Sequence, residues 1–385
     1  MARLGAACDS VICHVVASCH GSTSCQYMLP DLLLPMRYPA KRIRAILVPA
    51  ALILSVAPAA AQVTSQDASQ VTSQVTSQVT SQVAWRMTTE YPENNISGIG
   101  LATFASRVSD RTHGFVTVTN AFNNQLKINS GEMPRAALDG RIAGGDAFAG
   151  ALSGLDPVLG LSTLPFLMHS VDLARATNLR ARPLYEKALA ARGLKLLYVT
   201  IWPATGLWSE RSLEGADDLP KLNLRAYDAN STEVMRAAGA NAQFLPMDAA
   251  LAGLREHRLN AFLTSGDGGA GRKLWDFLPH FTAINYAMPI SIAFVRGDAF
   301  AELSEPMQRE VLAAAAETEQ SQLALLTHRT IENYARMRDN GVHIAEPAPA
   351  LLVAELRKAA KDAIAAWETR AGAEATAIVE WARQQ

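Results

Sequence analysis

Strand-like and helix-like segments alternate along the chain from Val83 onwards, and this alternation is the strongest constraint on its fold. Apolar residues at helical spacing run from Leu101 to Val108 and end at His113-Gly114, which is typical of an amphipathic helix. The predicted strands lie at 83–88, 115–119, 194–201, 222–227, 243–245 and 260–264. Further helices are predicted at 132–138, after Asn230 or Ser231, and after Asp248. Two α/β blocks with largely parallel sheets follow from this pattern.

The C-terminal third is predicted to be helical. The Ser-Glu-Pro sequence at 304–306 begins a helix with few breakers that continues to Gly341. At 1.5 Å per residue this helix is roughly 50 Å long, which is enough to cross both blocks. A second helical stretch begins near Pro349, and its alanine-rich spacing without sustained heptads favours packing on a globular body over a coiled coil.

The N-terminal region has the pattern of an export signal. Four basic residues precede an apolar run at 45–57, and three alanines at 59–61 follow as a small-residue cleavage site. We therefore predict a signal peptide at 36–61 and a mature chain that starts near Gln62. Residues 1–35 are interpreted as the result of a start codon placed too far upstream. The apolar run is shorter than the roughly 20 residues of a membrane span, although an uncleaved anchor is the alternative. These features predict a periplasmic protein.

Composition narrows the chemistry of the remaining chain. All four cysteines lie within 1–35, so the predicted mature protein has neither disulfides nor a catalytic thiol. The tetrad Val-Thr-Ser-Gln recurs across 62–82, and this stretch without large side chains predicts a low-complexity linker. The formal net charge of −1 gives no global bias toward nucleic acid or anionic lipid. We expect no nucleic-acid partner.

Arg225 is the most informative residue for function. In the predicted strand 222–227, apolar side chains fall on one face and polar ones, including Arg225, fall on the other. Arg225 lies near the carboxyl end of this strand, where open α/β sheets bind ligands, and the hydroxyls of Thr264 and Ser265 end another strand. A guanidinium fork matches a carboxylate, so the pattern predicts an organic-acid ligand. The alternative for a single arginine is a solvated surface charge.

The segment 266–271, Gly-Asp-Gly-Gly-Ala-Gly, satisfies the dinucleotide pattern Gly-x-Gly-x-x-Gly after a predicted strand. An exported nucleotide-dependent enzyme is therefore one alternative. The acidic residue expected about 20 positions later is absent, and Arg272-Lys273-Leu274 stands where a phosphate loop needs Gly-Lys-Ser/Thr. The mature chain has no metalloprotease or serine-hydrolase motif and no paired histidines at metal spacing. We expect a binding protein without catalytic residues, metal or cofactor.

A series of landmarks surrounds Arg225 in a definite order. The nine residues 217–225 read Asp-Asp-Leu-Pro-Lys-Leu-Asn-Leu-Arg. The other landmarks are Phe104–Val108, Gly140–Asp146, Leu164–Phe166, Ala238–Ala240, Leu259–Ala261 and the long helix. Together they resemble the DctP-type solute receptors of tripartite ATP-independent periplasmic (TRAP) transporters, whose matching segment reads Asp-Leu-Lys-Gly-Leu-Lys-x-Arg. The resemblance covers nearly everything from Trp85 onwards.

The resemblance implies a two-lobed α/β fold of the periplasmic-binding-protein type II kind, with crossover strands and a long lobe-spanning helix. The implied solute-binding domain spans 84–385, with lobe I at about 84–202 and 291–325 and lobe II at about 203–290 and 326–385. It implies a receptor that captures a carboxylate-containing small organic acid and delivers it to a membrane permease. A sensory receptor for the same kind of ligand is the alternative. We expect a monomer.

The resemblance also implies individual site residues. In the family, the arginine matching Arg225 pairs with the ligand carboxylate, and a second polar contact falls on Thr264. The family's usual Val-Asp-Gly is Leu-Asn-Ala at 259–261, and Pro220-Lys221 replaces the glycine of its Lys-Gly-Leu-Lys turn. Selectivity at the second polar contact is therefore expected to differ.

Three further residues are expected at the cleft by their positions in the chain. Glu90 lies in the first strand-helix loop, and Phe148 comes after the second strand. Trp208 is favoured over Trp202 as an apolar wall. Packing in the core or placement on the surface is the alternative for these side chains.

Overall fold

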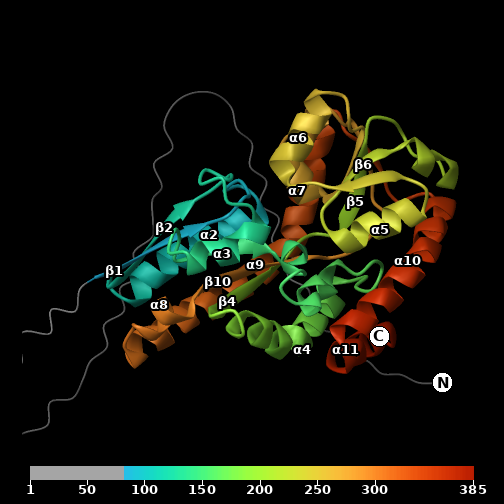
Figure 1. The fold of residues 1–385 in the computed structure, drawn as a ribbon. Helices are drawn as coiled ribbons and strands as arrows, with labels where there is room; N and C mark the ends of the chain where they lie inside the picture. Colours follow the sequence, from blue (N-terminus) through green and yellow to red (C-terminus); the bar gives the residue numbers. More distant parts are fainter. Residues whose placement is uncertain (1–81) are drawn as a thin grey trace, which may run out of the picture. The chain divides into compact units, whose positions relative to one another are not determined.

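The computed structural model describes residues 82–385, and the structural statements below refer to that part of the chain. It contains two mixed sheets with helices packed on them (Figure 1). The predicted leader, the signal peptide and the linker up to residue 81 lie outside the described residues. Within 82–385, no helix combines the length and apolar composition needed to cross a membrane.

The first sheet has the strand order β2-β1-β3-β10-β4 and, with its helices, forms lobe I. Its strands are β1 (Val83–Thr88), β2 (Val116–Ala121), β3 (Gly144–Phe148), β4 (Leu194–Ile201) and β10 (Ile290–Arg296). Four helices of the same lobe contact these strands: α2 (Ile96–Arg111), α3 (Met133–Leu138), α4 (Val171–Ala190) and α8 (Gly297–Ala301). β1 pairs in parallel with β2 and β3, while β10 runs antiparallel to β3 and β4.

The second sheet has the order β11-β9-β5-β8-β6-β7 and forms lobe II with its helices. Its strands are β5 (Thr205–Ser209), β6 (Asn223–Ala226), β7 (Asn241–Phe244), β8 (Ala261–Ser265), β9 (His280–Thr282) and β11 (His343–Ala345). Between them lie α5 (Ala229–Ala237), α6 (Met247–Arg255) and α7 (Gly266–Ala270). Short 3-10 helices occupy Ser130–Glu132, Ala149–Leu152, Pro157–Thr163, Ala216–Lys221 and Leu274–Asp276.

The chain crosses between the sheets from β4 to β5 and returns from β9 to β10. The expectation of largely parallel sheets is wrong for the strands that receive these crossings. β5 is antiparallel to β8 and β9, and β10 is antiparallel to β3 and β4. A strand that leaves a sheet toward the other lobe and a strand that returns from it pass through the same edge, so they must run in opposite directions.

The long helix α9 (Glu305–Asp339) begins within the Ser-Glu-Pro sequence, as predicted, and contacts α2 and β4 in lobe I and α7 and β11 in lobe II. The two-lobed α/β architecture with a lobe-spanning helix is thus confirmed. α10 (Ala350–Ala371) and α11 (Ala373–Arg383) follow, separated by Gly372 at φ 83°. α11 packs on α4 of lobe I, although the expected boundaries place 326–385 in lobe II.

Local signals located many elements but misplaced the start of one helix. α5 is capped by Asp228, whose carboxylate accepts a hydrogen bond from the N–H of Ser231, rather than by Asn230 or Ser231. The glycine-rich segment forms the short helix α7, which is capped by Ser265. In both cases an Asp or Ser side chain satisfies a free helix N–H just after the preceding strand ends.

Replacing Gly144 by alanine is expected to lower the free energy of unfolding by about 2 kcal/mol, as overpacking does. Gly144 lies on β3 between β1 and β10, and an added Cβ would lie 2.0 Å from the carbonyl oxygen of Phe294. Because that oxygen belongs to the neighbouring strand, it cannot move without distorting the sheet. Urea denaturation measures the loss. The control is Gly154→Ala, where an added Cβ meets no atom within 4 Å, and equal midpoints for both variants would contradict the prediction.

Candidate functional site

A cavity of about 30 Å³ lies between the lobes. Its lining comes from the carboxyl ends of β1, β3, β6 and β8 and from the crossover segments, and consists of Tyr91, Phe148, Trp202, Thr205, Arg225, Tyr227, Met247, Thr264, Ser265, Gly268 and Pro289. Parallel strands in open α/β sheets present ligand-binding groups at this end. The space holds about two water molecules, so a ligand of several atoms enters only when the lobes move apart.

Arg225 is the positive charge of this cavity. It lies on β6, which pairs with β7 and β8, and it is 7% exposed. Its Nε donates to the carbonyl of Leu245 at 3.0 Å, and its Nη1 lies 3.5 Å from the carbonyl of Leu263. Burial lowers the pKa of this guanidinium, and the nearby Tyr91 and Glu90 oppose that effect. No carboxylate of residues 82–385 forms an ion pair with Arg225.

Hydroxyl groups line the same cavity as the guanidinium. Thr264 and Ser265 end β8, and the antiparallel pairing of β5 with β8 places Thr205 opposite Ser265. The buried hydroxyls of Thr205 and Tyr227 lie close to each other and have no other hydrogen-bond partner among residues 82–385. Buried polar groups in native proteins are normally satisfied, so these hydroxyls are suited to bonding a ligand.

Aromatic rings form the apolar part of the lining. The rings of Tyr91 and Trp202 pack in a tilted arrangement with centroids 4.6 Å apart. The rings of Phe148 and Tyr227 meet edge to face with centroids 5.3 Å apart. Trp202 lines the cavity, whereas Trp208, the tryptophan expected there, is fully buried against Phe281 and is not among the lining residues. Alternation along β5 puts Thr205 on the cavity side and Trp208, three residues later, on the opposite face.

Glu90 lies behind the cavity lining and fixes one wall. Its carboxylate accepts hydrogen bonds from the N–H and the hydroxyl of Ser130, and that hydroxyl in turn accepts from the N–H of Phe148 at 2.9 Å. Arg272 of lobe II donates to the backbone carbonyl of Glu90 in lobe I. Glu90 therefore positions Phe148 and lies at a contact between the lobes, and its carboxylate is not part of the cavity lining.

Asp146 is a buried acid that the sequence analysis missed. It lies on β3 two residues before Phe148, is fully buried, and accepts a hydrogen bond from the hydroxyl of Ser97 at the start of α2. Burial raises the pKa of this carboxyl to about 7, and the Ser97 bond only partly opposes that rise. The sequence signal for it was a single aspartate among the small and apolar residues of 144–148.

The glycine-rich segment does not form an open phosphate-binding loop. Its residues from Gly266 to Ala270 are buried in α7, and an added Cβ on Gly269 would lie 2.3 Å from the Trp208 ring. Among residues 82–385, no group of three or more His, Cys, Asp or Glu side chains is placed to hold a metal ion. The chemistry of the cavity is thus that of one cation, several hydroxyls and aromatic walls.

The family model for the bacterial extracellular solute-binding proteins, family 7 (DctP), matches residues 87–369. Among similar solved structures is DctP6, a Bordetella pertussis extracytoplasmic solute receptor binding pyroglutamic acid, with 25% identity and a TM-score of 0.74 over 79% of this chain and 100% of that chain. A marine-metagenome TRAP solute-binding protein specific for pyroglutamate is 24% identical, with a TM-score of 0.74 over 79% and 99%.

A third similar structure is a TRAP periplasmic solute-binding protein from Chromohalobacter salexigens with bound D-glucuronate. It is 18% identical, with a TM-score of 0.72 over 78% of this chain and 99% of that chain. No curated protein gives a significant match to the chain.

Proposed function

The chain belongs to family 7 of the bacterial extracellular solute-binding proteins, and we propose that it captures a small organic carboxylate between its lobes and delivers it to a TRAP-type membrane permease. The solved relatives include extracytoplasmic and periplasmic receptors, and the signal pattern at 36–61 agrees with export to the periplasm. Capture would proceed by hinge closure of the two lobes over the ligand.

The buried, unpaired guanidinium of Arg225 is the observation that carries this proposal. A charge removed from water is costly unless a counter-charge pairs with it, and no carboxylate of 82–385 forms an ion pair with Arg225. A ligand carboxylate would supply that charge and accept a pair of parallel hydrogen bonds from the guanidinium fork. Thr264 and Ser265, at the neighbouring strand end, would bond the remaining polar atoms of the ligand.

The lining favours a compact acid that has both polar and apolar parts. It combines the hydroxyls of Thr205 and Tyr227 with the aromatic rings of Phe148 and Trp202. Pyroglutamate, a small ring with a carboxylate and a lactam, matches this combination, and it is the ligand of the relative at 25% identity. A hexuronate carries several hydroxyls on both faces and would leave some of them without partners against the aromatic rings.

We therefore expect L-pyroglutamate to bind at least roughly 10-fold more tightly than D-glucuronate, because a hydroxyl buried without a partner costs about 1–3 kcal/mol. Isothermal titration calorimetry of the full chain with each acid measures the ratio. Tighter binding of glucuronate would overturn the choice of a compact ligand. If no acid in a panel of small carboxylates raises the melting temperature at high excess, the receptor function itself is contradicted.

A further inference from the structure

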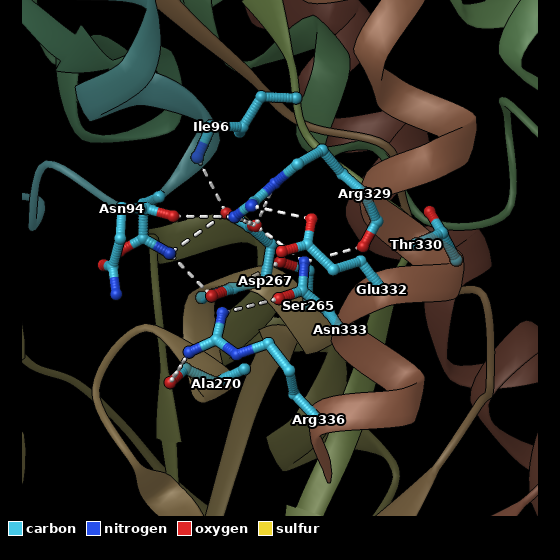
Figure 2. A network of polar contacts seen from close by, with 12 residues as sticks. Asn94, Ile96, Ser265, Asp267, Ala270, Arg329, Thr330, Glu332, Asn333 and Arg336 are labelled. Carbon is cyan, nitrogen blue, oxygen red and sulfur yellow. Dashed lines mark hydrogen bonds and ion pairs between the residues drawn. The ribbon is translucent and has the colours of Figure 1, made fainter. Parts of the chain in front are cut away.

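The glycine-rich segment carries a buried aspartate that joins the two lobes (Figure 2). Asp267 is 1% exposed. Its carboxylate accepts hydrogen bonds from the backbone N–H of Ile96 at 2.9 Å and from Nδ2 of Asn95 at 3.0 Å, both at the start of α2 in lobe I. It also pairs with Arg329 of α9, whose Nε lies 3.1 Å away. One carboxylate of lobe II therefore contacts lobe I and the helix that crosses both.

Two residues of α9 extend this junction. Arg329, whose side chain is 8% exposed, also donates from Nη2 to the carbonyl of Asn94 in lobe I at 2.7 Å. Asn333 donates from Nδ2 to the Asp267 carboxylate at 2.7 Å. Hydrogen bonds between ionised groups are about twice as strong as neutral ones, and those made by buried groups are little screened. Together these contacts favour one relative position of the lobes.

The glycines of the segment are explained by close approach across the lobe interface. A Cβ on Gly271 would lie 2.4 Å from the side chain of Asn95. Asn95 is itself fully buried and donates to both the carbonyl and the carboxylate of Asp267. It cannot move away from an added Cβ without losing those bonds. The spacing that resembles a dinucleotide motif thus allows lobe II to reach Asn95.

We propose that Asp267 is a positioning residue that couples ligand capture to closure of the lobes, an inference that rests on the proposed function. α7 follows directly from β8, whose end supplies Thr264 and Ser265 to the cavity, so these ligand contacts and Asp267 move together. Opening of the lobes separates Asp267 from Ile96 and Asn95. Contacts that exist only in the closed state stabilise that state. They therefore raise the fraction of molecules in which both lobes can contact the ligand.

Gly271→Ala tests this coupling without removing any polar group. Its backbone lies in the ordinary helical region at φ −62°, so alanine is tolerated in the open state, and its Cβ displaces Asn95 only when the lobes close. Asn95→Ala is a second variant that removes the same contact from the other lobe. Gly154→Ala is the matched control, because its Cβ meets no atom within 4 Å.

Hydrogen exchange of the Ile96 amide reports the junction directly. Ile96 is the first residue of α2, so its N–H has no acceptor within the helix. It donates instead to the carboxylate of Asp267. The amide of Leu173 is an internal control, because it is held by Ser170 at the start of α4 within lobe I. We would measure both amides in the full chain, without ligand and with saturating L-pyroglutamate, alongside calorimetric affinities.

We expect the Ile96 amide to exchange roughly 10-fold faster in Gly271→Ala and Asn95→Ala than in Gly154→Ala. Pyroglutamate is expected to bind the first two variants about 10-fold more weakly. The exchange rate of the Leu173 amide is expected to be the same in all three variants. Equal Ile96 exchange in Gly271→Ala and Gly154→Ala, with and without the acid, would overturn the coupling. If the parent chain does not bind pyroglutamate, that ligand is wrong. The ligand-free Ile96 comparison then decides the coupling: faster exchange supports it and equal exchange overturns it.

Discussion

Arg225→Ala is expected to weaken carboxylate binding by about 2–5 kcal/mol, the range for truncating one partner of a buried charge pair. That corresponds to roughly 30-fold to several thousand-fold in the dissociation constant. The reason is that the guanidinium is 7% exposed and no residue of 82–385 forms an ion pair with it, so the ligand would be its main counter-charge. Calorimetry with L-pyroglutamate measures the loss.

The same substitution is expected to leave the ligand-free protein as stable as the parent or more so. Burial lowers the pKa of Arg225, which reflects a charge that the fold holds at a cost, and alanine removes that cost. Thermal unfolding without ligand tests this second expectation. Arg236→Ala is the control, because Arg236 on α5 of the same lobe also donates to a backbone carbonyl, that of Ala242 at 2.7 Å.

The control variant is expected to bind as the parent does. Arg225→Lys keeps the charge but loses the planar fork, and is expected to fall between the parent and the alanine variant. Near-normal affinity of Arg225→Ala would contradict the site assignment. A large loss of ligand-free stability would instead show that Arg225 supports the fold through its bonds to Leu245 and Leu263.

Asp146→Asn is expected to remove a pH dependence of stability that the parent chain shows between about pH 4 and pH 7. Burial raises the pKa of the Asp146 carboxyl from 3.8 to about 7 in the folded protein. Between these values the unfolded carboxyl is ionised while the folded one still holds its proton. The folded state therefore binds more protons, and stability falls as pH rises through this window.

The size of the effect follows from the difference between the two pKa values. At about 1.4 kcal/mol per pKa unit, the protonated carboxyl contributes up to about 4 kcal/mol to the free energy of unfolding at pH 4. This contribution is lost above about pH 7. Asparagine is neutral throughout and resembles the protonated acid. Relative to the parent, Asp146→Asn should thus gain stability as pH rises from 4 to 8.

Urea denaturation of the parent and the variant at a series of pH values measures this difference, in which contributions from other titrating groups largely cancel. Asp298→Asn is the matched control, because the hydrogen bond from Arg296 lowers the pKa of Asp298. For that residue the stabilising contribution is lost as pH falls, so the difference from the parent has the opposite sign. A pH-independent difference for Asp146→Asn would contradict the raised pKa.

Much of the fold could be predicted from the sequence because its signals are local. Pro306 marks the start of α9, and apolar runs located the strands β4, β6 and β8 to within one or two residues. The cationic residue of the cavity could also be predicted, since alternation along one strand separates Arg225 from its apolar neighbours. Its role in binding a carboxylate stays a prediction.

Other features depend on which distant segments meet. The sequence pattern favoured Trp208 over Trp202, and only the pairing of β5 with β8 and β9 showed that Trp208 is buried against Phe281, whereas Trp202 lines the cavity. The direction of β5 and β10 was likewise decided by the two crossings between the sheets.

The sequence by itself determined a family, part of its order of strands and helices, and a cationic strand end suited to an acid. Tertiary structure alone decided the role of the glycine-rich segment, because Asp267 and Asn95 are 172 residues apart and meet only when both lobes have formed and closed. It also decided the state of Asp146, because a pKa near 7 arises from burial by helices and strands far away in the chain. Local patterns specify elements, whereas desolvation and contacts across lobes exist only after those elements are packed together.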